Sequence, residues 1–188
     1  MDWVYTFRRI ETDFTHGADQ SDSVSTVYGD SSHWLLHLLA GREIIREGFW
    51  VRDKILNLAP TLLSGHDVGW EYPADFIMPF YHCGLVSVSR FFIDPLWQLA
   101  GEELPLLPEE TIRSHSLVAL SCIEQRLGKV NLESVFYLPL LLGISLEVRS
   151  PRHRQRVMRL FRMIEDRGFA VARTFISDIQ LAWSLVPS

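Results

Sequence analysis

The sequence has little cysteine: Cys83 and Cys122 are the two in a chain of 188 residues. Two thiols so far apart cannot build a disulfide framework, and this usage is typical of a reducing compartment. The opening residues, MDWVYTFRRIETD, have no uncharged apolar core and no small-residue cleavage site, so they do not predict a secretory signal. We therefore expect an intracellular protein, located in the nucleus or the cytoplasm.

Long hydrophobic runs are missing as well, and so is an excess of positive charge. The longest apolar run, Val135 to Leu146, contains Pro139, Gly143 and Ser145 and is well short of the roughly 18–20 residues that cross a bilayer. The formal net charge of −5 opposes nonspecific attraction to nucleic acid or anionic lipid. These absences predict a protein that neither enters a membrane nor binds DNA directly.

The residues that are present predict a helical core. Hydrophobic residues make up 47% of the chain, with 11 Phe and 6 Trp, which suits one folded domain. Seven segments repeat apolar residues with helical spacing, and none shows the alternation of a strand: 31–48, 51–63, 72–95, 107–128, 131–148, 151–167 and 169–186. We predict an all-α fold, a single domain of about seven helices packed as hairpins over residues 31–188. A polar, partly irregular segment at residues 1–30 precedes it.

Caps and breakers predict where several helices begin and end. Ser31 or Ser32 is expected to cap the first helix and Gly48 to end it. Pro79 predicts a kink or a late start in the central helix, and Ser150 with the proline after it predicts a new helix. In the central helix, the apolar side is expected to carry Ile77, Phe80, Tyr81, Gly84, Leu85, Val88, Phe91 and Phe92.

Arginine is concentrated in one place, since seven of the sixteen arginines lie between residues 149 and 167. Helical spacing puts Arg152, Arg156, Arg159 and Arg162 on the side opposite an apolar stripe: Val157, Leu160, Phe161 and Ile164. This basic face is either a solvated surface, partly neutralised by the acidic N-terminal segment, or a docking surface for an acidic partner, a phosphate or nucleic acid. Nucleic acid is the least favoured, because no aromatic or glycine residues interleave the arginines.

One further arginine, Arg154, lies at the edge of the apolar stripe. Glu147, near the end of the preceding helix, is its expected partner across the tight connection VRSP. Such a charge-assisted pair would fix the angle between the two helices, which is a structural role. By the same reasoning Arg156 is expected to be solvated, so that its removal changes stability very little.

Residues that could carry catalysis are few. His33 and His37 have the i, i+4 spacing of metal ligands, but no third ligand is evident, so we predict no metal and no cofactor. His82 and Cys83 are sequence neighbours that point about 100° apart on a helix, a poor geometry for a nucleophile and its base. Glu71 precedes an aromatic-rich helix without an aspartate-rich diphosphate motif. The candidates for polar groups in an apolar catalytic pocket are thus His33, His37, His82 and Glu71.

The stretch YLPLLLGISLEVRSPRHRQRVMRLFRMI, with a tryptophan further on, resembles the C-terminal part of the fungal-specific regulatory domain of zinc-cluster (Zn(II)2Cys6) transcription factors. The matching positions are Pro139, Gly143, Glu147, Arg154 and Trp183. HWLLHLLAGREIIREG and FYHCGLVSVSRFF are similar to two other helices of that domain, so the resemblance spans roughly residues 33–184. The six cysteines of the family's DNA-reading zinc cluster have no counterpart in this chain.

The resemblance implies a non-DNA-binding, transcription-regulator-like protein that acts through a protein partner or an apolar small molecule, in the regulation of fungal secondary metabolism. The alternative is a small helical enzyme or ligand-binding protein of a fungal biosynthetic pathway built on the same scaffold, and a third possibility is a scaffold of a larger assembly. The central region also carries much aromatic surface, which predicts a homodimer or an obligate partner: Phe76, Phe80, Phe91, Phe92, Trp97 and Leu99.

Overall fold

The computed structural model describes residues 27–63, 74–129 and 132–185, and every regular element in these ranges is a helix. The prediction of a single all-α domain is confirmed. The α-helices are α2 (Val27–Leu56), α3 (Ala59–Leu63), α4 (Ala74–Phe91), α5 (Glu109–Leu127), α6 (Leu138–Glu147), α7 (Pro151–Asp166) and α8 (Val171–Leu185), and two 3-10 helices are η1 (Pro95–Ala100) and η2 (Leu132–Tyr137).

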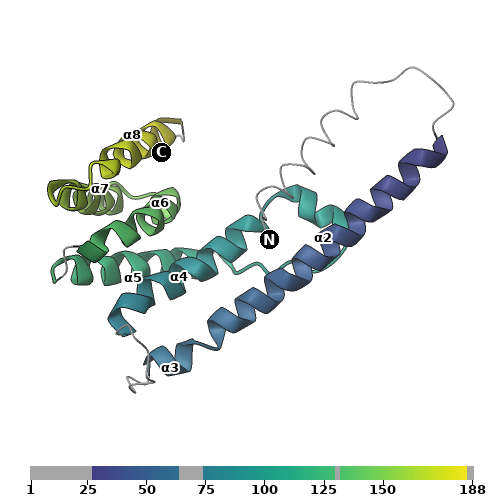
Figure 1. The fold of residues 1–188 in the computed structure, drawn as a ribbon, viewed down its shortest axis with the longest axis horizontal. Helices are drawn as coiled ribbons and strands as arrows, with labels where there is room; N and C mark the ends of the chain where they lie inside the picture. The colour runs from purple at the N-terminus through teal and green to yellow at the C-terminus, as the bar shows by residue number, and fades with distance from the viewer. Residues whose placement is uncertain (1–26, 64–73, 130–131, 186–188) are drawn as a thin grey trace.

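The helices form a bundle with one long helix along its side. α4 and α5 lie side by side in opposite directions, and α6, α7 and α8 gather against one end of this pair (Figure 1). The main core lies among α4 to α8, around the fully buried side chains of Tyr137, Leu141 and Phe161. None of the described helices is long and apolar enough to cross a membrane.

The long helix, α2, docks through a second, smaller cluster. Ile45 of α2 packs there against Phe92, Trp97 and Ala100, which come from the end of α4 and from η1. Beyond this contact α2 extends past the rest of the described chain (Figure 1). The cluster buries Phe92 and Trp97, which the sequence assigned to a partner surface, whereas Phe91 and Leu99 stay 38% and 55% exposed. A homodimer therefore stays a prediction, resting on less aromatic surface than the sequence suggested.

The boundaries predicted for α2 are wrong. The helix begins at Val27, before Ser31, and continues through Gly48 to Leu56, so that it includes the first predicted helix and the start of the second, whose end forms α3. Gly48 is buried, and a Cβ atom added to it would collide with the ring of Phe92. The glycine thus allows close packing between α2 and the end of α4 and does not terminate the helix.

Substitution of Gly48 by alanine should test this packing role. Alanine favours a helix by about 1 kcal/mol, but the buried Phe92 ring would have to move, so we expect a net loss of about 1–3 kcal/mol in the free energy of unfolding. Gly41→Ala in the same helix is the matched control: no atom lies within 4 Å of its added Cβ, so it should gain about 0.5–1 kcal/mol. Urea denaturation measures both changes. A gain at both positions would contradict the packing role.

Prolines shape the central helices differently from the prediction. α4 starts at Ala74 and continues through a buried Pro79, so the late start is not observed. The predicted helix over residues 131–148 is divided into η2 and α6, with Pro139 in the first turn of α6. A proline has no N–H to donate to the preceding turn, but it fits the first turn of a helix, where that N–H would have no partner.

The predicted start of α7 is confirmed. The Ser150 side chain accepts a hydrogen bond from the backbone N–H of His153 at 3.3 Å, and Pro151 is the first helical residue. The helix ends at Asp166, and Gly168 follows with a φ of +96°. The predicted core side of α7 is fully buried: Val157, Leu160, Phe161 and Ile164.

Candidate functional site

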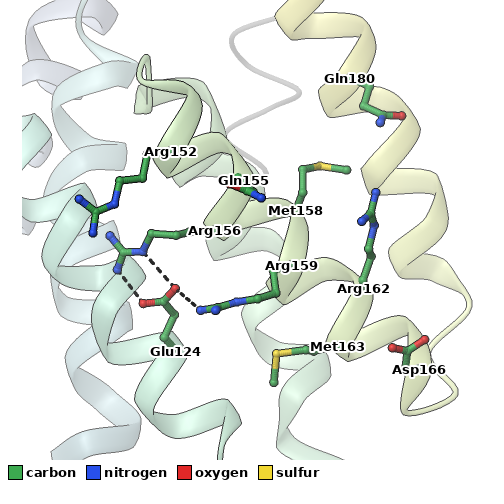
Figure 2. Close-up of a pocket in the computed structure, with 10 residues that line it drawn as sticks. All are labelled: Glu124, Arg152, Gln155, Arg156, Met158, Arg159, Arg162, Met163, Asp166 and Gln180. Atoms are coloured by element: carbon green, nitrogen blue, oxygen red, sulfur yellow. Dashed lines mark hydrogen bonds and ion pairs between the residues drawn. The ribbon is translucent and has the colours of Figure 1, made fainter.

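The basic face of α7 lines an open depression of about 1190 Å³, which we call the arginine groove (Figure 2). All four arginines of the predicted docking face line it: Arg152, Arg156, Arg159 and Arg162. They come from one side of α7, since residues three and four apart share a helix face. Glu124 of α5 lies on one flank and Gln180 of α8 on the other. The buried side of α7 fixes the helix between these neighbours.

Arg156 is half-buried and ion-paired, which corrects the prediction of a solvated side chain. Its Nε donates to Glu124 Oε1 at 3.0 Å and its Nη2 to Glu124 Oε2 at 2.6 Å and to Ser121 Oγ at 3.1 Å. Arg159 donates to the same carboxylate at 2.9 Å. The hydrogen bonds from Arg156 lower the pKa of Glu124 and raise the pKa of Arg156 itself. Two of the four arginines are therefore held by one glutamate.

Arg156→Ala should lower the free energy of unfolding by about 1–2 kcal/mol, because Glu124 loses the arginine that donates two hydrogen bonds to it. The loss stays moderate because Arg159 still compensates part of the charge of Glu124. Arg152→Ala is the control for removing an arginine from the same face, and it should change stability by less than about 0.5 kcal/mol. Urea denaturation of the two variants compares the effects. Equal and small changes would contradict a stabilising role for the Arg156–Glu124 pair.

Arg152 and Arg162 differ from the inner pair. Both are exposed, and neither makes a hydrogen bond or ion pair with a described residue. Arg162 extends toward α8, where Gln180 lies, and away from Asp166 (Figure 2). The groove is lined by four arginines and by the carboxylates of Glu124 and Asp166, so its formal charge is +2. The chain as a whole has a net charge of −5. The groove is thus a local positive surface with two guanidinium groups available to an anion.

The predicted Glu147–Arg154 pair is not formed. Glu147 accepts hydrogen bonds from Arg90 of α4, from Nε at 2.7 Å and from Nη2 at 2.5 Å. The same Nη2 donates to Glu109 at 2.9 Å. Because Arg90 reaches the end of α6 from a neighbouring helix, it takes the carboxylate that sequence proximity assigned to Arg154.

Arg154 instead contacts the C-terminal helix. Its guanidinium lies 5.1 Å from the centre of the Trp183 ring, and its Nε donates to the carbonyl of Val148 at 3.4 Å. Trp183 in turn donates from Nε1 to the carbonyl of Ser145 at 2.8 Å. Arg154 and Trp183 therefore join α7 and α8 to the end of α6, a structural role of a different kind from the predicted one.

Of the four catalytic candidates, only His82 has a described side chain. His33 and His37 belong to α2, but their side chains and the whole of Glu71 lie outside the described residues. His82 is buried, and its Nδ1 lies 2.7 Å from Nδ1 of His115 on α5. The sequence did not indicate His115, because its position on α5 gave no sign that it faces α4.

The histidine pair is a contact between neutral rings. Burial and, to a smaller extent, the neighbouring His115 lower the pKa of His82 to about 4, and burial lowers the pKa of His115. Between two neutral rings, one Nδ1 carries a hydrogen and donates a hydrogen bond to the other Nδ1. The adjacent thiol is no better suited to catalysis, because burial and then Cys122 raise the pKa of Cys83 to about 12.

Other features that could support chemistry are small. In the ranges that the structure describes, no group of three or more His, Cys, Asp or Glu residues is placed to hold a metal ion. A hollow beside Cys83, Ser116 and Gly143 has a volume of about 40 Å³. Pockets for small ligands usually measure about 300–1000 Å³, so this hollow does not support an apolar ligand site.

The fold and the groove together define a class: an all-helical protein that presents an arginine-lined surface on an otherwise acidic chain. No protein-family model, curated protein or solved structure matches the chain. The resemblance to the zinc-cluster regulatory domain stays a prediction.

Proposed function

We propose that this chain is a non-DNA-binding, transcription-regulator-like protein that acts through a protein partner docked in the arginine groove. The observation that carries the proposal is the pair of exposed arginines, Arg152 and Arg162, which have no partner among the described residues. The groove is open and follows α7, whose 16 residues measure about 24 Å. Such a long, open surface fits a polypeptide better than a small molecule, which usually binds in a more enclosed pocket.

The regulatory part of the proposal rests on the residues that carry the resemblance. Among them, Glu147 bonds to Arg90, and Arg154 lies over Trp183. The first contact joins α6 to α4 and the second joins α7 to α8, so together they help to maintain the platform that presents the groove. Glu147, Arg154 and Trp183 are thus positions of the resemblance that stabilise this platform, which supports a scaffold shared with the family.

Duplex DNA is not the proposed partner. A DNA backbone carries one negative charge per about 1.7 Å of helix axis, and Glu124 and Asp166 inside the groove would repel it. We expect the purified protein to retain duplex DNA no better than a generic acidic protein at physiological salt. A mobility-shift titration checks this, and sequence-selective retention of a duplex would contradict the proposal.

The proposal is tested by recruitment. The chain is fused to an unrelated DNA-binding domain and tethered upstream of a reporter gene in a fungal cell. We expect the tethered wild-type chain to change reporter output several-fold and Arg152→Glu/Arg162→Glu to abolish the change at equal protein abundance. A reporter that does not respond to the wild-type chain would overturn the proposed function.

A further inference from the structure

Resting on the proposed function, we infer that the partner contributes an acidic amphipathic helix that lies along α7 in the arginine groove. Two carboxylates of this helix pair with Arg152 and Arg162, and apolar side chains between them contact Met158. This partner chemistry follows from which arginine side chains of the groove are free and which are already paired.

The free charges lie at the two ends of the groove. Arg152 and Arg162 are ten residues apart on α7, which corresponds to about 15 Å along the helix axis. Between them, Arg156 and Arg159 are occupied by Glu124. A ligand therefore finds an available guanidinium group at each end and, between them, two arginines whose charge Glu124 partly neutralises. Carboxylates spaced about three turns apart on a single helix face match this pattern.

The middle of the groove offers adaptable apolar contact. Met158, which lies between the two free arginines along α7, is half-buried and lines the depression, as does Met163, one residue past Arg162 (Figure 2). Methionine side chains are flexible and polarisable, and they recur on surfaces that receive the apolar face of a helix. The complementary partner face therefore carries an acidic residue at each end and apolar residues between them, over about three turns. This mixed pattern distinguishes a peptide helix from a plain polyanion.

The mixed charge of the groove favours carboxylates over phosphate groups. Phosphate is bound best by clusters of arginine that donate in pairs, but Glu124 already occupies the two adjacent arginines. Asp166 adds a second negative charge to the lining. Two partner carboxylates that are far apart match the two separated arginines. Closely spaced phosphate groups would also lie near Glu124 and Asp166 and be repelled by them.

The experiment uses a synthetic peptide as probe and the full chain as receptor. The peptide is a helix of about 15 residues with two glutamates about ten residues apart and two leucines between them on the same face. Fluorescence anisotropy measures its binding at about 50 mM and about 200 mM salt. We expect binding by the wild-type chain that weakens with salt, and at least about tenfold weaker binding by Arg152→Glu/Arg162→Glu.

The control variant has the same change of charge outside the groove. Arg113→Glu/Lys129→Glu alters two exposed residues of α5 and the turn that follows it, and it should bind the peptide within about twofold of the wild-type chain. Circular dichroism verifies that both variants fold: Arg152 and Arg162 make no hydrogen bond or ion pair with a described residue, and the Lys129–Asp75 ion pair is long, at 3.9 Å, and exposed. Equal weakening in both variants would overturn the inference, because it would show attraction to total charge alone.

Three further outcomes decide the nature of the ligand. A peptide of the same composition interrupted by proline should bind at least about tenfold more weakly, and equal binding would overturn the helical form. Inorganic polyphosphate that binds more tightly than the peptide would overturn the preference for carboxylates. Reporter activity that survives Arg152→Glu/Arg162→Glu, while peptide binding is lost, would overturn the regulatory use of the groove and leave the peptide site supported.

Discussion

Replacement of Glu147 by alanine is expected to lower the free energy of unfolding by about 2–4 kcal/mol. The Glu147 side chain is 9% exposed and that of Arg90 is 27% exposed, so most of the pair is removed from water. Without Glu147, the guanidinium group of Arg90 stays half-buried with Glu109 alone to compensate it. Loss of one partner of a buried charged pair is more destabilising than loss of a surface pair, because the remaining charge keeps its desolvation penalty.

A double-mutant cycle distinguishes the observed pair from the one that the sequence suggested. Arg90→Ala and Glu147→Ala should be strongly non-additive, with a coupling of more than about 1 kcal/mol, since the two side chains share two hydrogen bonds. Arg154→Ala should cost about 0.5–1 kcal/mol through its contact with Trp183, and it should add to Glu147→Ala without coupling. Stronger coupling of Glu147 to Arg154 than to Arg90 would contradict the structure.

The second large effect is a loss of stability in mild acid caused by His82. Its pKa is lowered from 6.5 to about 4 in the folded chain, so below about pH 6.5 the unfolded chain binds a proton that the folded chain resists. The stabilisation is complete above pH 6.5 and is lost as the pH falls toward 4. The shift corresponds to about 3 kcal/mol at most, at 1.36 kcal/mol per pKa unit.

Urea denaturation at about pH 7, 5.5 and 4.5 measures this dependence. His82→Gln should remove most of the slope over this range, since its side chain does not titrate. His115→Gln should leave a reduced slope, because burial, the larger cause, still acts on His82. Glu109 and Glu124 have lowered pKa values, so their contributions are lost below about pH 4.5, outside this window. An unchanged slope in His82→Gln would contradict the assignment.

The sequence by itself determined the features that depend on local spacing. Helical periodicity alone predicted the all-α fold and the buried side of α7, because a side chain's direction from its own helix axis follows from its position. The cap at Ser150 was predictable, since a serine before a proline satisfies the free N–H groups of the first turn. The grouping of Arg152, Arg156, Arg159 and Arg162 on one face followed from the same rule.

The tertiary structure decided which side chains meet. Arg90 and Glu147 are 57 residues apart, His82 and His115 33 apart, and Arg156 and Glu124 32 apart. Periodicity within one helix gives no information on which helix lies beside it, so these three pairs could not be read from spacing.

The same limit explains the partly misplaced face of α4 and the misread glycine. The predicted apolar side is confirmed for Leu85 and Phe92, which are buried, but Phe80, Tyr81 and Val88 are only half-buried, whereas His82 and Ser89 are buried. This side of α4 faces α5 and the residues before it, where both polar groups find partners: His115 of α5 for His82, and the backbone N–H of Leu107 for Ser89. Gly48 looked like a helix end because its local conformation is permissive, but the approach of the Phe92 ring from α4 made it a packing position. Which side chains pair and how closely two helices approach are decided only in the folded bundle, because both depend on how the helices pack.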